Sequence, residues 1–176
     1  MSEPTAAGDT YRVLVVCTGN ICRSPMAEVV LTERLDEAGL DSSVQVDSAG
    51  ISDEEHGRPI DPRAQQELAA RDYPVPDRSA RQVTAQDGQT YDLMLAMTRQ
   101  HARALRRVGV PEEKIRLYRS YDPQATGSDV ADPWYGDQNG FAECLDMIED
   151  IAPAVVAELR EAVGSSNADS TTAREQ

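Results

Sequence analysis

Cys17 and Arg23 bracket a glycine-containing loop that follows a short apolar segment, residues 13–16. The apolar segment consists of leucine and β-branched residues, as a buried strand requires. Directly after the loop, Ser24 can cap a helix, and Pro25 fits the first turn because no amide hydrogen is needed there. This order of elements predicts that Cys17 and Arg23 face one small space in which a phosphate-sized dianion would fit.

The loop is predicted to bind phosphate through Thr18, Gly19, Asn20, Ile21, Cys22, Arg23 and Ser24. Its amides can turn inward as a nest and add to the positive charge at the helix N-terminus. Arg23 offers a planar fork that can pair with two phosphate oxygens. These groups also favour the thiolate of Cys17, whose pKa we expect within the range of activated cysteines, roughly 3.5 to 7.5. A thiolate behind a phosphoryl group is placed for in-line displacement and a phosphocysteine intermediate.

The spacing of Cys17 and Arg23 alone does not establish a catalytic cysteine, because a lone cysteine after a strand is usually a small buried hydrophobic residue. The whole string VLVVCTGNICRSP, residues 13–25, is far more specific. It favours a nucleophile in the floor of an anion site.

The elements that must position the loop alternate between strand and helix patterns. Strand patterns occupy residues 13–16, 44–46, 91–96 and 115–118, and helix patterns occupy residues 27–38, 64–70, 102–108 and 141–163, with Thr98 as a cap and Pro153 kinking or dividing the last helix. Strands separated by helices pair in parallel and form a three-layer sandwich. The predicted fold class is α/β: a four-stranded parallel twisted sheet with helices on both faces and the phosphate-binding loop after the first strand.

Length and charge restrict the remaining possibilities. The 176 residues suit one domain, predicted at residues 11–163, and the small polar segments 1–10 and 164–176 are predicted to be disordered tails. The net charge of −14 argues against nucleic acid or a membrane surface as a partner. No segment has the apolar length of a signal peptide or a membrane span, and three cysteines are too few for a secreted disulfide scaffold. The predicted location is the cytoplasm.

The chain resembles the low-molecular-weight protein tyrosine phosphatases, and among them the bacterial, actinobacterial-type members. The resemblance spans about residues 11 to 160 and rests on CTGNICRSPMAE at 17–28, DSAG at 47–50, DPR at 61–63, ARQ at 80–82 and DPWYG at 132–136. It implies that Cys17 is the nucleophile, that Arg23 binds phosphate and stabilises the transition state, and that Asp132 is the general acid. Asn20 and Ser24 would support the loop and the thiolate.

The implied enzyme is a redox-sensitive phosphatase that needs no cofactor and no metal, since the loop amides and Arg23 already supply the positive charge. Its expected partner is a phosphotyrosine-containing protein, with a tyrosine kinase as one candidate, and the expected oligomeric state is a monomer.

Two Asp-Pro pairs compete for the role of general acid, at Asp122 and Asp132. Either aspartate can start a turn. Trp134 and Tyr135 follow only the second, and their aromatic faces can flank a phenyl ring. We therefore favour Asp132, and we expect Asp122 to have a structural role in its loop.

The substrate pocket wall is predicted to include Ile51, Glu54, Trp134 and Tyr135. Glu54 stands where tryptophan is common in relatives, and such an acidic wall could favour a basic peptide flank or disfavour acidic phosphopeptides. Arg78 stands where some relatives have histidine, with a consequence that the sequence leaves open.

Cys22 is either a packed small side chain or a redox partner that captures oxidised Cys17 as a disulfide, and the resemblance favours the second. Cys144 lies in the last helix pattern and is predicted to belong to the core.

Two further functions compete with phosphotyrosine hydrolysis. Arsenate reduction on the same fold needs another pair of thiols past the second helix, and residues 71–100 contain no cysteine. A catalytically dead phosphate-binding module is disfavoured because Cys17 and Asp132 are both present. Ile21 favours the tyrosine-specific members, because related arginine phosphatases carry threonine in that position.

Overall fold

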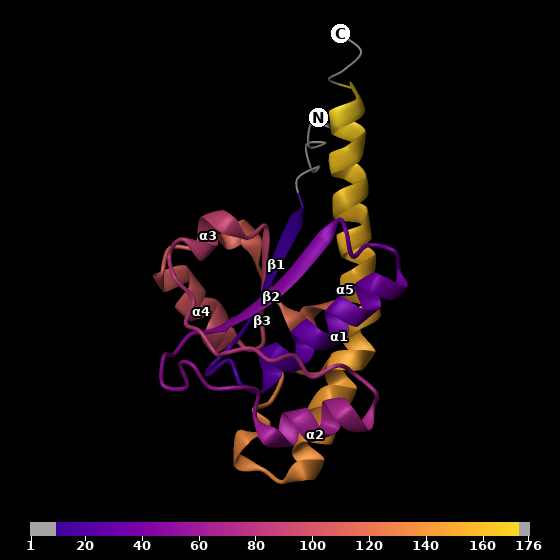
Figure 1. Ribbon diagram of the computed structural model, residues 1–176. Coiled ribbons are helices and arrows are strands. Elements are labelled where there is room, and N and C mark those ends of the chain that lie inside the picture. Colours follow the sequence, from indigo (N-terminus) through magenta and orange to yellow (C-terminus); the bar gives the residue numbers. More distant parts are fainter. Residues whose placement is uncertain (1–9, 173–176) are drawn as a thin grey trace, which may run out of the picture.

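Four parallel strands form the sheet of the computed structural model, which describes residues 10–172. They are β1 (Tyr11–Cys17), β2 (Val44–Gly50), β3 (Leu93–Ala96) and β4 (Ile115–Leu117). β1 pairs with β2 on one side and with β3 on the other, and β4 pairs with β3, so the order is β2-β1-β3-β4 (Figure 1). The predicted four-stranded parallel sheet is confirmed.

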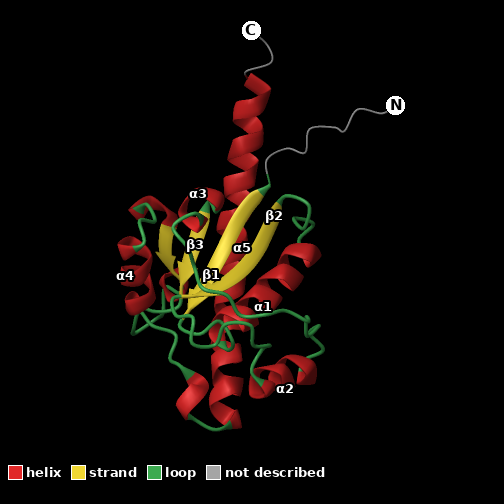
Figure 2. Ribbon diagram, turned by 60° about the vertical axis from the view of Figure 1, so that its left-hand side comes forward, coloured by secondary structure: helices red, strands yellow, loops and turns green. Residues whose placement is uncertain are grey.

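The helices cover both faces of this sheet. They are α1 (Arg23–Glu37), α2 (Pro62–Ala70), α3 (Asp87–Thr90), α4 (Arg99–Arg107) and α5 (Gln138–Thr172), with the 3-10 turns η1 (Glu112–Lys114), η2 (Tyr118–Tyr121) and η3 (Pro133–Tyr135). Side chains of β1 alternate between the faces: Val13 and Val15 join the core cluster with α1 and α5, whereas Leu14 and Val16 join the cluster with α4. Figure 2 shows the sheet between these two helical layers, as the predicted sandwich requires.

The start of α1 differs from the prediction. The helix begins at Arg23 with Cys22 in the cap position, and Ser24 lies inside the first turn, so Ser24 is not the cap. Its hydroxyl turns toward the loop instead, where it meets the Cys17 thiol. The predicted cap of α4 is confirmed, because the Thr98 side chain accepts a hydrogen bond from the His101 amide at 3.2 Å.

The last helix is longer than predicted. α5 runs from Gln138 to Thr172, Pro153 does not divide it, and it projects beyond the sheet in Figure 1. The helix therefore continues past residue 163, since extending an existing helix costs less than starting a new one. Residues 1–9 and 173–176, which belong to the two predicted tails, lie outside the described residues. Within the described part of the chain, no helix has the length and apolar character needed to cross a membrane.

Candidate active site

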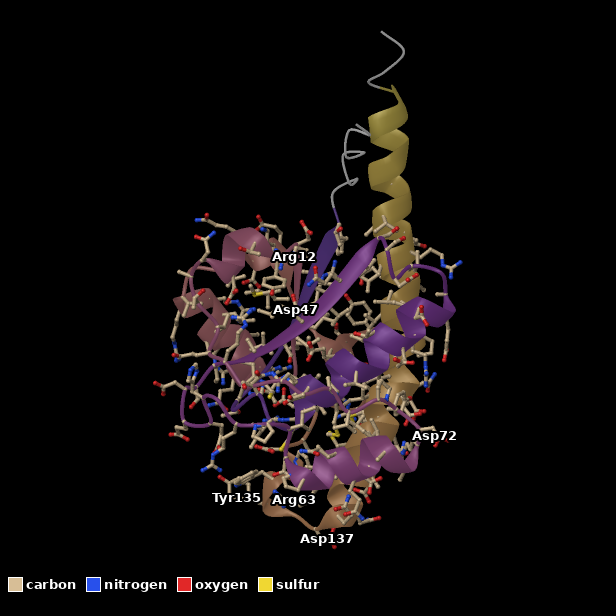
Figure 3. All side chains as sticks on the ribbon, viewed as in Figure 1. Arg12, Asp47, Arg63, Asp72, Tyr135 and Asp137 are labelled. Carbon is tan, nitrogen blue, oxygen red and sulfur yellow. The ribbon has the colours of Figure 1, made fainter. Side chains whose placement is uncertain are left out.

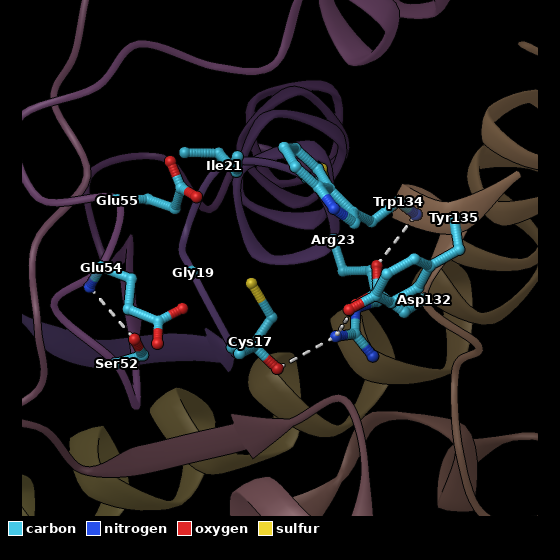
Figure 4. Close-up of a pocket in the computed structure, with 12 residues that line it drawn as sticks. Cys17, Gly19, Ile21, Arg23, Ser52, Glu54, Glu55, Asp132, Trp134 and Tyr135 are labelled. Carbon is cyan, nitrogen blue, oxygen red and sulfur yellow. Dashed lines mark hydrogen bonds and ion pairs between the residues drawn. The ribbon is translucent and has the colours of Figure 1, made fainter.

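A pocket lies at the carboxyl end of β1, beside the point where the strand order reverses between β2 and β3. Open α/β sheets bind ligands in this position. The pocket is lined by Cys17, Thr18, Gly19, Ile21, Cys22, Arg23, Ser52, Glu54, Glu55, Asp132, Trp134 and Tyr135 (Figure 4). The three predicted catalytic residues, Cys17, Arg23 and Asp132, thus come together around one cavity.

The backbone of β2 braces the loop that follows β1. The Ile51 amide donates to the Cys17 carbonyl at 2.9 Å, and the Ser52 amide donates to the Thr18 carbonyl at 3.1 Å. At Gly50 the two segments are so close that an added Cβ would lie 2.5 Å from the Thr18 carbonyl oxygen. Only glycine fits there without moving the loop.

Polar side chains beneath the loop support the Cys17 thiol. The Cys17 Sγ lies 3.0 Å from the Ser24 Oγ, and the Asn20 Nδ2 donates to the same hydroxyl oxygen at 2.9 Å. The Ser24 proton can therefore point toward sulfur, although the Ala49 carbonyl is a second acceptor at 3.4 Å. A thiolate would be the stronger of these acceptors, because charge-assisted hydrogen bonds exceed neutral ones.

Asn20 is itself held in an unusual backbone conformation, with φ at +61°. Arg78 donates to the Asn20 carbonyl at 2.8 Å and also to its side-chain oxygen, and the Arg81 amide donates to that side-chain oxygen at 3.1 Å. These bonds orient the Asn20 amide so that its NH₂ group faces Ser24 and Ser48. Arg78, whose role the sequence left open, therefore holds the loop in place through its hydrogen bonds to Asn20.

The hydrogen bonds of Asn20 continue through Ser48 to the partly buried carboxylate of Glu28. The Ser48 hydroxyl accepts a hydrogen bond from the Asn20 side chain at 2.9 Å and donates one to the Glu28 Oε2 at 2.8 Å. The same Glu28 oxygen lies 4.0 Å from the Arg78 Nε. Burial raises the pKa of Glu28 and lowers the pKa of Arg78. No sequence pattern singles out Ser48 or Glu28, although both lie in segments that carry the family resemblance, residues 47–50 and 17–28.

Arg23 reaches the pocket from the first turn of α1, and its side chain is only 5% exposed. It donates to the Val130 carbonyl at 3.0 Å and to the Thr18 hydroxyl at 3.3 Å, and its Nη2 lies 3.3 Å from the Asp132 Oδ2. The Nε of Arg23 is buried and has no hydrogen-bond partner among the described residues. An oxyanion in the pocket is a natural acceptor for this guanidinium.

His101 is a buried contact of the loop that the sequence did not assign to the site. Its Nε2 lies 2.9 Å from the Thr18 Oγ1, the hydroxyl to which Arg23 donates. Burial and the nearby Arg23 lower the pKa of His101 to about 3, so the ring is neutral at physiological pH. His101 therefore fixes the Thr18 side chain without adding a charge to the pocket.

The aromatic part of the pocket wall comes from η3, where the structure places Trp134 and Tyr135. The Asp132 Oδ1 accepts a bond from the Trp134 amide at 3.0 Å, while Arg63 donates to the Trp134 carbonyl at 3.1 Å and lies over its ring. Tyr135 is 89% exposed and lies beside Arg63 at the lower edge of the molecule in Figure 3. Asp122 does not line the pocket; it lies in another loop, where its side chain accepts a hydrogen bond from the Gln124 amide at 2.9 Å.

The wall on the other side differs in part from the prediction. Glu54 lines the pocket, as do Ser52 and Glu55, which no sequence pattern indicated. Ile51 does not line it, because its side chain packs against the core cluster under α4.

All three cysteines are buried free thiols. Cys22 lines the pocket with Cys17, and burial together with the charge of Asp61 raises its pKa. Cys144 packs in the core with α1 and α5, as predicted, and burial raises its pKa to about 12.

Comparisons with known proteins agree on one family. The family model for low molecular weight phosphotyrosine protein phosphatases matches residues 12–165. A low molecular weight protein-tyrosine-phosphatase of Streptomyces coelicolor is 46% identical over 159 residues, which cover 88% of this chain and 96% of that protein. Low molecular weight protein-tyrosine phosphatase A of Mycobacterium tuberculosis is 42% identical, over 84% of this chain and 90% of its own. The structure of a protein tyrosine phosphatase from Entamoeba histolytica superposes with a TM-score of 0.82 at 30% identity, covering 87% and 99% of the two chains.

Proposed function

This chain belongs to the low molecular weight phosphotyrosine protein phosphatase family and is a protein-tyrosine phosphatase, and from that premise we propose that it hydrolyses phosphotyrosine through a phosphocysteine intermediate. The observation that carries the proposal is the meeting of Cys17, Arg23 and Asp132 in one pocket. Cys17 is the proposed nucleophile, Arg23 the phosphate-binding group and Asp132 the general acid and base.

The proposed reaction has two steps. In the first, the Cys17 thiolate attacks phosphorus, the bond from phosphorus to the tyrosine oxygen breaks, and the Asp132 carboxyl gives its proton to the leaving phenolate. In the second, the Asp132 carboxylate takes a proton from a water molecule whose oxygen attacks phosphorus. The phosphorus–sulfur bond then breaks, releasing phosphate and restoring the thiolate.

The loop contributes in both steps by holding the transferred phosphoryl group. The proposed phosphate contacts are the amides from Thr18 to Arg23 and the Arg23 fork, which meet the charge on the equatorial oxygens. Ser24 donates to the Cys17 sulfur when that sulfur leaves as a thiolate. Asn20, which Arg78 holds, bonds to the Ser24 hydroxyl and keeps it in place for this role.

Asp132 is a better candidate for the acid than Asp122 because only Asp132 lines the pocket, where its Oδ2 faces Arg23. A bound phosphate would engage the Arg23 fork and would put an anion beside this carboxyl group. Trp134 and Tyr135 supply apolar faces on the same side for the phenyl ring.

The substrate is proposed to be a phosphotyrosine-containing protein, with a tyrosine kinase as one candidate. Action as a monomer, a cytoplasmic location and a domain spanning residues 11–163 stay predictions from the sequence. Arsenate reduction is disfavoured because residues 71–100 hold no cysteine and Cys144 is packed in the core.

A substrate panel tests the proposed function. The purified protein is offered phosphotyrosine, phosphoserine and phosphoarginine peptides, and separately arsenate with a thiol reductant. We expect the value of kcat/KM to be at least about 100-fold higher for phosphotyrosine than for the other phosphopeptides, because the aromatic side chains of Trp134 and Tyr135 that line the pocket suit a phenyl ring. A preference for phosphoarginine, or arsenate turnover, would contradict the proposal.

We also propose that Cys22 is the redox partner of Cys17. Mild peroxide oxidises the Cys17 thiolate to a sulfenic acid, and the Cys22 sulfur then displaces hydroxide, which takes up a proton and leaves as water, to form a disulfide. Because burial raises the pKa of Cys22, we expect disulfide closure to be slower than the first oxidation. The expected result is inactivation that dithiothreitol reverses in the wild type and fails to reverse in Cys22→Ser. Cys144→Ser is the control, and equal recovery of all three proteins would exclude the disulfide.

A further inference from the structure

Two glutamates form one side of the pocket mouth. Glu54 and Glu55 both line the pocket, and Figure 4 shows them on the side of Cys17 opposite Asp132 and Tyr135. They belong to the segment that follows β2 directly, so their distance from the nucleophile is set by the sheet.

Hydrogen bonds to the backbone hold this segment in place. The Ser52 amide is bonded to the Thr18 carbonyl, the Glu54 amide donates to the Ser52 hydroxyl at 3.1 Å, and the Gly57 amide donates to the Ala80 carbonyl at 2.9 Å. In addition, an atom added at the Cβ position of Gly19 would lie 3.0 Å from the Glu55 side chain. The backbone that carries the two glutamates is therefore held at the mouth.

The charge of these carboxylates is only partly balanced. Glu55 faces the Arg58 Nε at 3.2 Å, but the Arg58 side chain is 67% exposed, and exposed ion pairs are weak. Among the described residues Glu54 has no ion-pair partner, and Asp53 next to it is exposed. Across the pocket, by contrast, the Asp132 carboxylate has Arg23 at 3.3 Å. The surplus negative charge at the mouth thus lies at Glu54 and Glu55.

A phosphotyrosine that reaches Cys17 places its peptide backbone at this mouth, with the flanking residues next to the glutamates. A lysine or arginine beside the phosphotyrosine gains Coulomb attraction there, whereas an aspartate or glutamate is repelled. We infer that Glu54 and Glu55 make this phosphatase selective for phosphotyrosine flanked by basic residues. The inference rests on the proposed phosphotyrosine activity and adds the class of sequence around the phosphotyrosine.

Three matched phosphotyrosine peptides test the inference, with lysine, alanine or glutamate in the two positions on each side. In the wild type we expect kcat/KM for the lysine peptide to exceed that for the glutamate peptide by about tenfold at low salt, with the ratio shrinking as salt is added. In the double variant Glu54→Gln with Glu55→Gln, the ratio should fall to about twofold or less.

The matched control removes the same amount of charge elsewhere. Asp36→Asn with Glu161→Gln changes two exposed acids that do not line the pocket, and this variant should keep the wild-type ratio. Equal values for the three peptides in the wild type, or an unchanged ratio in the Glu54 and Glu55 variant, would overturn the inference and leave the proposed function intact. If none of the three peptides were hydrolysed, the proposed function would fail and the inference with it.

Discussion

Turnover of phosphotyrosine is expected to fall to the background rate when Cys17 is replaced by serine, while binding of inorganic phosphate should persist. The serine hydroxyl is not ionised at neutral pH, so no nucleophile faces the phosphoryl group. The change does not alter the loop amides, Arg23 or the hydrogen bonds of Asn20, so the anion site should remain intact. Steady-state kinetics measure the first effect, and isothermal titration calorimetry with phosphate measures the second.

Cys144→Ser is the matched control for Cys17→Ser. Cys144 is also a buried thiol, but it packs in the core and does not line the pocket. This variant should keep kcat while losing stability, because a buried hydroxyl without a partner costs about 1–3 kcal/mol. If Cys17→Ser retained activity within about tenfold of the wild type, a rate loss too small for removal of a nucleophile, Cys17 would not be the nucleophile.

Replacing Asp132 with asparagine is expected to slow phosphotyrosine hydrolysis by roughly 100- to 10,000-fold, the usual contribution of a general acid. The amide oxygen of asparagine can still accept the bond from the Trp134 amide, so η3 should stay in place. The loss should shrink for aryl phosphates with acidic phenols, because their leaving groups need no proton. Pre-steady-state phosphorylation rates measured across a series of leaving groups test this dependence.

The pH profile gives a second measure of the same group. The basic limb of the wild-type profile should report loss of the Asp132 proton, and it should flatten in the asparagine variant. Asp122→Asn is the control, since an asparagine there can likewise accept the bond from the Gln124 amide. Similar behaviour of the two variants, or no dependence on the leaving group in Asp132→Asn, would assign the acid to another residue.

Much of the fold could be predicted because it follows from local periodicity. The buried strand before Cys17 and the alternation of strands with helices determine a parallel sheet, and Cys17 and Arg23 lie in one short segment whose geometry is local. The predicted start of α1 was wrong by two positions, because Ser24 can serve either as a cap or as a partner of Cys17, and local preference alone does not choose between these uses.

The parts of the site that come from distant segments were harder to predict. His101 lies in an ordinary amphipathic helix pattern, and only the packing of α4 against the sheet brings it to Thr18. Glu55 and Ile51 differ by a few positions in one loop, yet one lines the pocket and the other packs under α4. Which way each side chain turns depends on hydrogen bonds across the sheet, which have no local sequence pattern.

The parallel sheet also governs when the chain can become active during folding. Each pairing of β1 with β2 and β3 joins segments separated by a crossover, so the entropy of closing long loops must be overcome before these pairings stabilise the fold. Val130 and Asp132, which hold Arg23, arrive after all four strands have been synthesised. A ribosome-bound chain that ends before them would carry the complete Cys17 loop and still lack the proposed general acid. We therefore expect activity to appear only after the segment that follows all four strands has folded against the loop.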